Sequence, residues 1–159
     1  EVTSALSHLT VFDGCIVVDD LAAARWLGLT YLASDDASWA NFQEVGLYEL
    51  AAQDIRRGLA IGVLDETDIW RTDSEAWAKL EAAEDPAIRQ LVALVRPDTK
   101  FVWDEDQPDF RVSTKLRTID PDVLTAGQIQ PLSSLDPDFA RQRADYLRRK
   151  KGKWPMRVV

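Results

Sequence analysis

Two residue types that carry much of protein catalysis occur once each in this chain: His8 is its single histidine and Cys15 its single cysteine. An imidazole works as a general base, and a thiol as a nucleophile, when a second side chain orients or deprotonates it. No carboxylate stands next to His8, and the aliphatic residues 16–18 follow Cys15, so no cation there would stabilise a thiolate. We therefore expect Cys15 to be a small core residue and the chain to contain no catalytic residue.

Metal binding is disfavoured by the same count. A zinc site needs three or four ligands, drawn mainly from histidine and cysteine. The acidic residues 104–109 have the composition of a calcium loop, but an EF-hand needs glycine at its sixth position and glutamate at its twelfth, where this chain has Asp109 and Lys115. We expect a solvated connector here, and neither a metal ligand nor a cofactor in this chain.

Cations provide the first candidate for a binding site. In residues 110–119, apolar or threonine side chains at the even positions alternate with mainly charged or polar ones at the odd positions. This period of two predicts a strand and places Arg111, Lys115 and Arg117 on one of its faces. Cations clustered on a rigid strand can hold a phosphate or a nucleotide through charge-assisted hydrogen bonds. The alternative is an exposed face that balances the acidic remainder of the chain.

A second group of cations is consecutive in the sequence: Arg148, Arg149, Lys150 and Lys151. These side chains could bind an anion or a protein partner. They could equally complement the negative end of the helix that they close. The net charge of the whole chain is −8, and an acidic body repels nucleic-acid backbones, so nucleic acid is an unfavourable partner.

Composition indicates a folded protein, because 46% of the residues are hydrophobic and 29% are charged. No apolar run approaches the roughly 18–20 residues that span a bilayer, and the N-terminus does not resemble a signal peptide. A single cysteine is typical of a reducing cytoplasm, where we expect this protein. The sequence does not begin with methionine, which indicates an excised domain or a processed chain.

The first part of the chain is predicted to be mainly helical. Asp13-Gly14 between two β-prone runs predicts a tight hairpin over 9–18. Residues 34–36 should end one helix and cap the next, and Thr72 with Glu75 forms a capping box. Capping residues and apolar spacing together predict helices over 21–32, 37–59, 72–80 and 87–95.

The pattern changes at Pro97. We predict strands over 100–103 and 110–119, a hairpin over 123–132 and a last strand over 154–159, with one helix that begins after Asp136. The fold class is therefore α+β, with a helical lobe over 1–96 and a small α+β lobe over 97–159.

Two stretches are similar to known sequences. Residues 58–64 leading into 68–80, and residues 114–124 followed by 131–136, resemble the region downstream of the catalytic core in HD-domain phosphohydrolases of the deoxynucleotide triphosphohydrolase kind. The resemblance covers roughly residues 40–159. The His-Asp metal ligands of that family have no counterpart, since His8 is followed by Leu9. The resemblance thus implies an accessory C-terminal part, with any divalent metal bound by an upstream HD domain.

Three hypotheses follow. The first is a non-catalytic assembly or regulatory domain of an HD-type phosphohydrolase, which contacts the upstream catalytic domain, another copy of itself or a nucleotide phosphate. The second is a free-standing acidic protein-binding module, of the inhibitor or immunity type, that captures a basic partner through electrostatic steering. The third is a small enzyme that uses carboxylates alone, which would require a deep pocket with two close acids.

Overall fold

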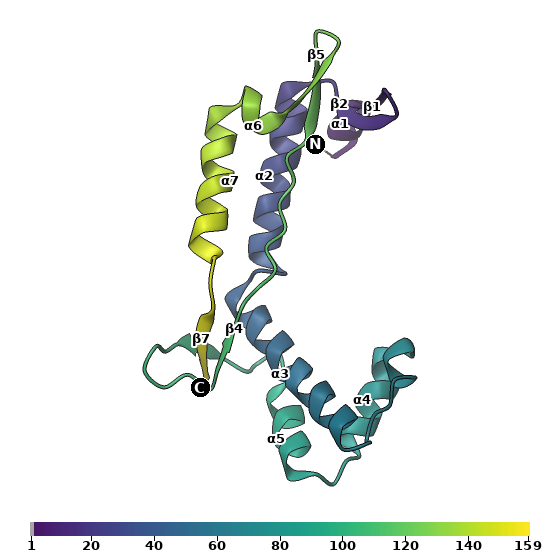
Figure 1. Cartoon of the computed structure of the whole chain (residues 1–159), viewed down its shortest axis with the longest axis vertical. Coiled ribbons are helices and arrows are strands. Elements are labelled where there is room, and N and C mark those ends of the chain that lie inside the picture. The colour runs from purple at the N-terminus through teal and green to yellow at the C-terminus, as the bar shows by residue number, and fades with distance from the viewer. Residues whose placement is uncertain (1) are drawn as a thin grey trace. The chain divides into compact units, whose positions relative to one another are not determined.

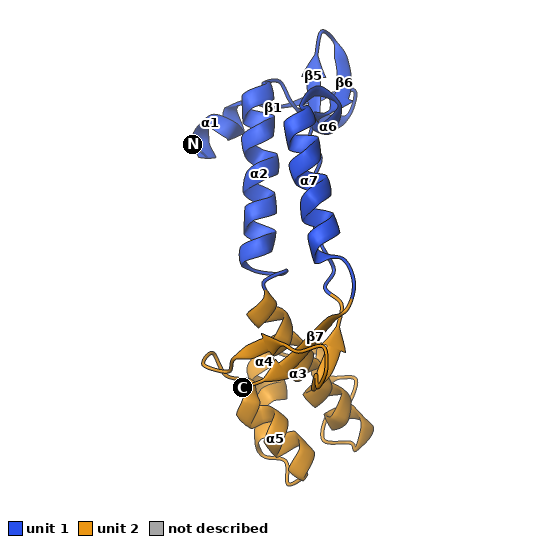
Figure 2. Ribbon diagram, turned by 90° about the vertical axis from the view of Figure 1, so that its left-hand side faces the viewer, with its two compact units in different colours: residues 1–41, 114–152 blue, residues 42–113, 153–159 orange. Residues whose placement is uncertain are grey.

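A computed structural model describes residues 2–159 of the chain. It combines helices with two small sheets, so the predicted α+β class is confirmed. The chain folds into two compact units (Figure 2). Unit 1 comprises the residues up to 41 and residues 114–152, and unit 2 comprises 42–113 and 153–159. The boundary that the sequence suggested, between residues 96 and 97, lies inside unit 2.

Unit 1 contains two helix pairs and a four-stranded sheet. Its elements are α1 (Val2–Ser7), β1 (Leu9–Phe12), β2 (Cys15–Val18), α2 (Leu21–Ala37), β5 (Asp122–Thr125), β6 (Gln128–Pro131), α6 (Leu132–Leu135) and α7 (Pro137–Lys150). The strand order is β1-β2-β5-β6, with β2 and β5 parallel at Val18 and Val123 and the other neighbours antiparallel.

Both hairpins of this sheet turn on two residues with positive φ. The values are 50° at Asp13 and 77° at Gly14, and 51° at Ala126 and 76° at Gly127. This is the type I′ geometry that matches the twist of antiparallel strands, and it favours glycine at the second position. Both predicted hairpins are therefore confirmed.

Helices α2 and α7 lie side by side and contain the core of unit 1 (Figure 1). Asp136 caps α7, since its carboxylate accepts from the backbone N–H groups of residues 138 and 139. The buried residues come from these two helices, from α6, from the sheet and from the loop after α2: Val18, Ala24, Leu32, Ala40, Val123, Leu132, Phe139 and Tyr146. Leu116 packs against them from the segment before β5.

Unit 2 is mainly helical. Its elements are α3 (Phe42–Ala60), the 3₁₀ turn η1 (Asp68–Trp70), α4 (Asp73–Glu81), α5 (Pro86–Leu94), β3 (Phe101–Trp103), β4 (Phe110–Val112) and β7 (Trp154–Val158). The sheet has the order β3-β7-β4, with β7 antiparallel to both neighbours. The predicted Thr72–Glu75 capping box is present, and Asp85 caps α5. No described helix is both long and apolar enough to cross a membrane.

The predicted break at residues 34–36 is wrong, because α2 continues to Ala37. The acidic residue that should have ended the helix, Asp35, is fully buried and finds hydrogen-bond donors in other parts of unit 1. Polar residues near a helix end favour termination only when their side chains are free to cap the backbone.

The apolar spacing that predicted a helix over 37–59 matches the buried face of α3 only in part. Tyr48 and Leu59 are 50% and 39% exposed. The buried positions of this helix are Val45, Gly46, Leu50, Asp54 and Gly58. The two glycines are buried because neighbours approach the backbone closely: a Cβ at Gly46 would lie 2.7 Å from the Phe101 ring.

The strand predicted over 110–119 is also shorter than expected, since β4 ends at Val112. The chain leaves unit 2 after residue 113 and runs through unit 1 without regular structure until β5. Alternation of side chains beyond residue 112 therefore does not represent a strand, because no neighbouring strand pairs with that segment.

Candidate functional site

The structure collects most of the predicted binding residues in unit 1. Lys115 and Arg117 lie on the irregular segment before β5, and residues 148–151 end α7 and cap it. Arg111 lies on β4 in unit 2, where its Nη1 is 3.1 Å from Glu105 Oε2. The single cationic strand face expected from the sequence is not formed, because β4 ends at Val112, before Lys115 and Arg117.

Asp35 connects α2, α7 and the segment that carries Lys115 and Arg117. Its Oδ2 accepts from the Tyr146 hydroxyl at 2.6 Å and from the Arg117 backbone N–H at 3.1 Å. Burial, together with the hydrogen bond to Asp35, raises the pKa of Tyr146 above its ordinary value, so the phenol stays protonated and remains a donor. The backbone at Arg117 is thus fixed beside both helices.

Arg117 also contacts an aromatic ring. Its guanidinium carbon lies 5.1 Å from the centre of the Trp39 ring, and the Thr114 hydroxyl donates to the Trp39 carbonyl at 3.4 Å. A cation over an indole face is favourable and orients the guanidinium. The side chains of Arg117 and its neighbour Lys115 are exposed, so both remain accessible to an anion.

The side chain of Lys150 contacts other residues of unit 1. Its ammonium donates to the Ala40 carbonyl at 2.6 Å, forms an ion pair with Asp36 and lies 5.9 Å from the centre of the Tyr146 ring. Its side chain is 18% exposed. These contacts join the end of α7 to the loop after α2, and they make Lys150 a structural cation.

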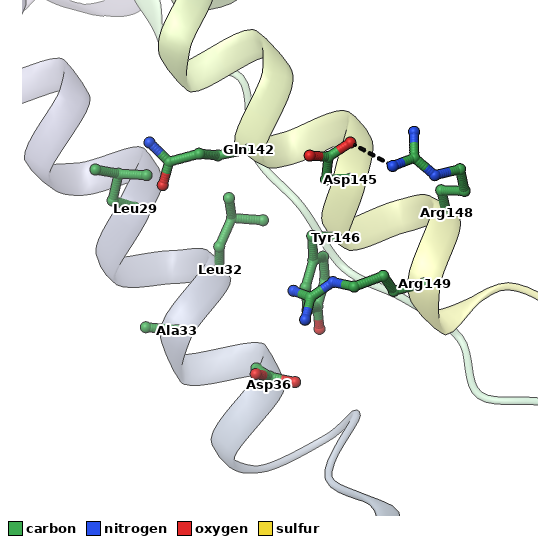
Figure 3. A pocket seen from close by; sticks show the side chains of 9 residues that line it. All are labelled: Leu29, Leu32, Ala33, Asp36, Gln142, Asp145, Tyr146, Arg148 and Arg149. Carbon is green, nitrogen blue, oxygen red and sulfur yellow. Dashed lines mark ion pairs between the residues drawn. The ribbon is translucent and has the colours of Figure 1, made fainter.

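A groove of about 480 Å³ lies between α2 and α7 (Figure 3). On the α2 side it is lined by Leu29, Leu32, Ala33 and Asp36, and on the α7 side by Gln142, Asp145, Tyr146, Arg148 and Arg149. Arg148 and Asp145 form an ion pair of 2.8 Å. The sequence predicted the two arginines of this groove but none of its other residues, because an apolar i, i+4 pair such as Leu29 and Ala33 usually indicates core.

His8 has an acidic neighbour that sequence proximity did not reveal. Its Nδ1 lies 2.9 Å from Asp19 Oδ1, because the antiparallel hairpin of β1 and β2 returns the chain to its starting point. Both side chains are more than one-third exposed. The expectation that Cys15 is a core residue is wrong, since it is exposed beside the hairpin turn.

The N-terminal part of unit 1 presents an apolar face to solvent. The exposed fractions are 62% for Val2, 60% for Leu6, 70% for Val11 and 73% for Ile16. Val11 and Ile16 are opposite each other on β1 and β2. A groove of about 190 Å³ is lined by apolar residues of α1, α2 and the hairpin, among them Val2 and Leu6. We refer to these four residues as the N-terminal apolar face.

Metal ligation is not supported by the side chains that the structure describes. Within residues 2–159, no group of three or more histidine, cysteine, aspartate or glutamate side chains is arranged to hold a metal ion. The donor set of this part of the chain therefore does not fit the divalent cation of an HD-type enzyme.

Two curated proteins are similar to this chain. The Cordyceps militaris protein named metal-dependent phosphohydrolase cns2 is 30% identical over 135 residues, which are 83% of this chain and 39% of that protein. The Bacillus subtilis protein YdhJ, named as uncharacterized, is 28% identical over 124 residues, which are 78% of this chain and 38% of that protein. The chain thus spans about two-fifths of the length of these relatives. No family model matches the chain, and no solved structure does.

Proposed function

We propose that this chain is a non-catalytic assembly and regulatory region of an HD-type metal-dependent phosphohydrolase. The observation that carries the proposal is the similarity of most of this chain to two-fifths of a protein named as a metal-dependent phosphohydrolase. The chain has one histidine, and Leu9 follows it, so it does not contain the His-Asp pair that gives HD enzymes their name. The metal would then be bound by residues outside this sequence.

The N-terminal apolar face supports the assembly role. Large apolar patches on a protein surface mark contact sites, since exposing them to water is unfavourable. Here four aliphatic side chains, each at least 60% exposed, lie on α1, which contacts α2, and on the β1–β2 hairpin, which pairs with β5. The occupant that we propose is the metal-binding part of the phosphohydrolase, which would bury these side chains against its own apolar surface.

Lys115 and Arg117 support the regulatory role. Both are exposed, and Trp39 and Asp35 hold Arg117 through its guanidinium and its backbone, respectively. A guanidinium that is already oriented loses less entropy when it binds a phosphate. Arg111 lies in unit 2 and is paired with Glu105, so the proposal rests on Lys115 and Arg117.

A chimera tests the proposal. The matching stretch of the Cordyceps protein is replaced by this chain, and phosphohydrolase activity with Mn²⁺ is compared with that of the same protein lacking the stretch. We expect the chimera to be active and the deletion to be inactive, while this chain alone shows no turnover. Turnover of nucleoside triphosphates by this chain alone would overturn the proposal.

The chimera also tests the contact surface. Val11→Asp with Ile16→Asp places two charges in the N-terminal apolar face and should reduce activity by about tenfold or more through loss of the contact. Trp70→Asp is the matched control, because Trp70 is 88% exposed but lies in unit 2. Equal activities of the two variants would show that this face is not the contact.

A further inference from the structure

The groove between α2 and α7 has the size and the surface of a small-molecule site. Its volume of about 480 Å³ lies within the range of roughly 300–1,000 Å³ that is usual for ligand pockets. Leu29 and Ala33 are one turn apart on α2 and, with Leu32, form an apolar wall. Gln142 extends from α7 toward this wall (Figure 3). An occupant would therefore contact aliphatic groups on one side and polar groups on the other.

The charges of the groove leave one cation available. Asp145 is paired with Arg148, and Asp36 is paired with Lys150, so both carboxylates of the groove are compensated. Within the described part of the chain, Arg149 forms no ion pair. Its guanidinium extends beside Tyr146 toward the space between the helices (Figure 3).

From these contacts we propose that the groove binds a small phosphorylated molecule with an apolar or aromatic part. The phosphate accepts hydrogen bonds from the Arg149 guanidinium, whose planar geometry fits two phosphate oxygens. The apolar part covers Leu29, Leu32 and Ala33. This inference is independent of the proposed function, since the groove is lined neither by the N-terminal apolar face nor by Lys115 and Arg117.

The acidity of the chain determines which ligands can bind. With a net charge of −8, the protein repels free anions, so one arginine does not retain inorganic phosphate by itself. Contact with the apolar wall must contribute the remaining free energy, at roughly 25 cal/mol for each Å² that is removed from water. Both parts of the ligand are therefore required on one molecule.

Calorimetric titration of the full chain tests this inference with 1-naphthyl phosphate as the probe. Binding should be at least about tenfold weaker for 1-naphthol and for inorganic phosphate, each of which lacks one of the two parts. Adenosine monophosphate is titrated in parallel. Its binding in the groove would indicate a nucleotide, and binding of the naphthyl compound alone would indicate another aromatic phosphate.

Variants locate the site. Arg149→Ala should weaken binding of the probe by about tenfold, because it removes the charge-assisted hydrogen bonds. Ala33→Asp, at an exposed position on the apolar wall, should abolish binding through charge repulsion. Arg141→Ala is the control, since Arg141 is a 70% exposed arginine of the same helix that does not line the groove.

Three results would overturn the inference. They are unchanged affinity in Arg149→Ala, equal affinity for 1-naphthol and its phosphate, and absence of any heat up to millimolar probe. Thermal unfolding of each variant by circular dichroism verifies that the helices of unit 1 are intact. If Arg149→Ala unfolds, it is replaced by Arg149→Gln, which keeps a polar but shorter and uncharged side chain and should weaken binding in the same way.

Discussion

Each unit buries an aspartate on a long helix, and the two aspartates differ in their hydrogen-bond partners. Asp35 on α2 and Asp54 on α3 are both fully buried. Asp35 Oδ2 accepts from Tyr146 and from the Arg117 backbone, while its Oδ1 has no hydrogen-bond partner among the described residues. Neither oxygen of Asp54 has a hydrogen-bond partner among the residues that the structure describes, and burial raises the pKa of its carboxyl to about 6. The two positions share residue type, burial and helical context, so only the donors from distant segments distinguish them.

A third buried aspartate, Asp68, is compensated by a counter-charge. Asp68 in unit 2 accepts from the Lys79 ammonium, which is 2.7 Å from each of its carboxylate oxygens, and these hydrogen bonds lower its pKa. A buried carboxylate is tolerated when donors or a counter-charge replace the water that it has lost. Unit 1 does this with a tyrosine and a backbone N–H, and unit 2 does it at Asp68 but not at Asp54.

The largest effect is expected for removal of the Asp35 carboxylate, whose Oδ2 accepts two hydrogen bonds. Asp35→Ala leaves the buried Tyr146 hydroxyl and the partly buried Arg117 N–H without an acceptor, and it should lower the free energy of unfolding by about 3 kcal/mol. Urea denaturation followed by circular dichroism measures the change. Ser34→Ala, at the exposed neighbouring position, is the control and should change stability by less than about 0.5 kcal/mol. Equal effects of the two substitutions would mean that Asp35 does not hold the segment.

The opposite sign is expected at Asp54. Its folded pKa of about 6 exceeds the reference value of 3.8, so the fold favours the protonated carboxyl. This contribution to stability is present below about pH 4 and is lost as the pH rises through about 6. Asp54→Asn does not titrate, so at pH 8 the variant should be more stable than the wild type by roughly 3 kcal/mol.

Denaturation of wild type and Asp54→Asn at pH 4, 6 and 8 measures this difference, which should shrink toward zero at pH 4. The matched control is Asp98→Asn, because Asp98 in the same unit is 85% exposed and its charge is already solvated. A constant difference between wild type and Asp54→Asn at all three pH values would contradict a raised pKa at this position.

A smaller effect is expected when one donor to Asp35 is removed. Tyr146→Phe keeps the buried ring but removes the 2.6 Å hydrogen bond, which should cost about 1–2 kcal/mol. The ultraviolet absorbance of the wild type should also show one tyrosine that ionises at a higher pH than usual, and this signal should be absent from the variant. Tyr31→Phe on α2 is the control. Loss of the late-ionising signal in that control would show that the signal comes from Tyr31 and not from Tyr146.

The comparison also explains which features could be predicted. Both hairpins, the Thr72 capping box and the caps at Asp85 and Asp136 follow from residues within four positions of one another, and all of them are present. The division into units does not follow from such signals, because the chain enters unit 2 at residue 42 and returns to it at 153.

Local sequence patterns also predicted the candidate site only in part. The sequence indicated the cations at 115, 117 and 148–151, but placed the first two on one strand with Arg111, and that strand ends at Val112. It also interpreted Asp35 as a helix stop. The donors that make Asp35 acceptable inside α2 are 82 and 111 positions away in the sequence, so no local pattern could have identified them.

The smallest effect tests whether local signals act alike in both units. Asp85 caps α5 and pairs with Arg57, and Asp136 caps α7 and pairs with Arg25. Because both caps combine the same side chain, a following proline and an arginine, Asp85→Ala and Asp136→Ala should each lower the melting temperature by a similar amount, about 4 °C. Differential scanning calorimetry measures both. If one substitution has several times the effect of the other, capping strength depends on the unit, and the distinction between local signals and distant donors does not hold.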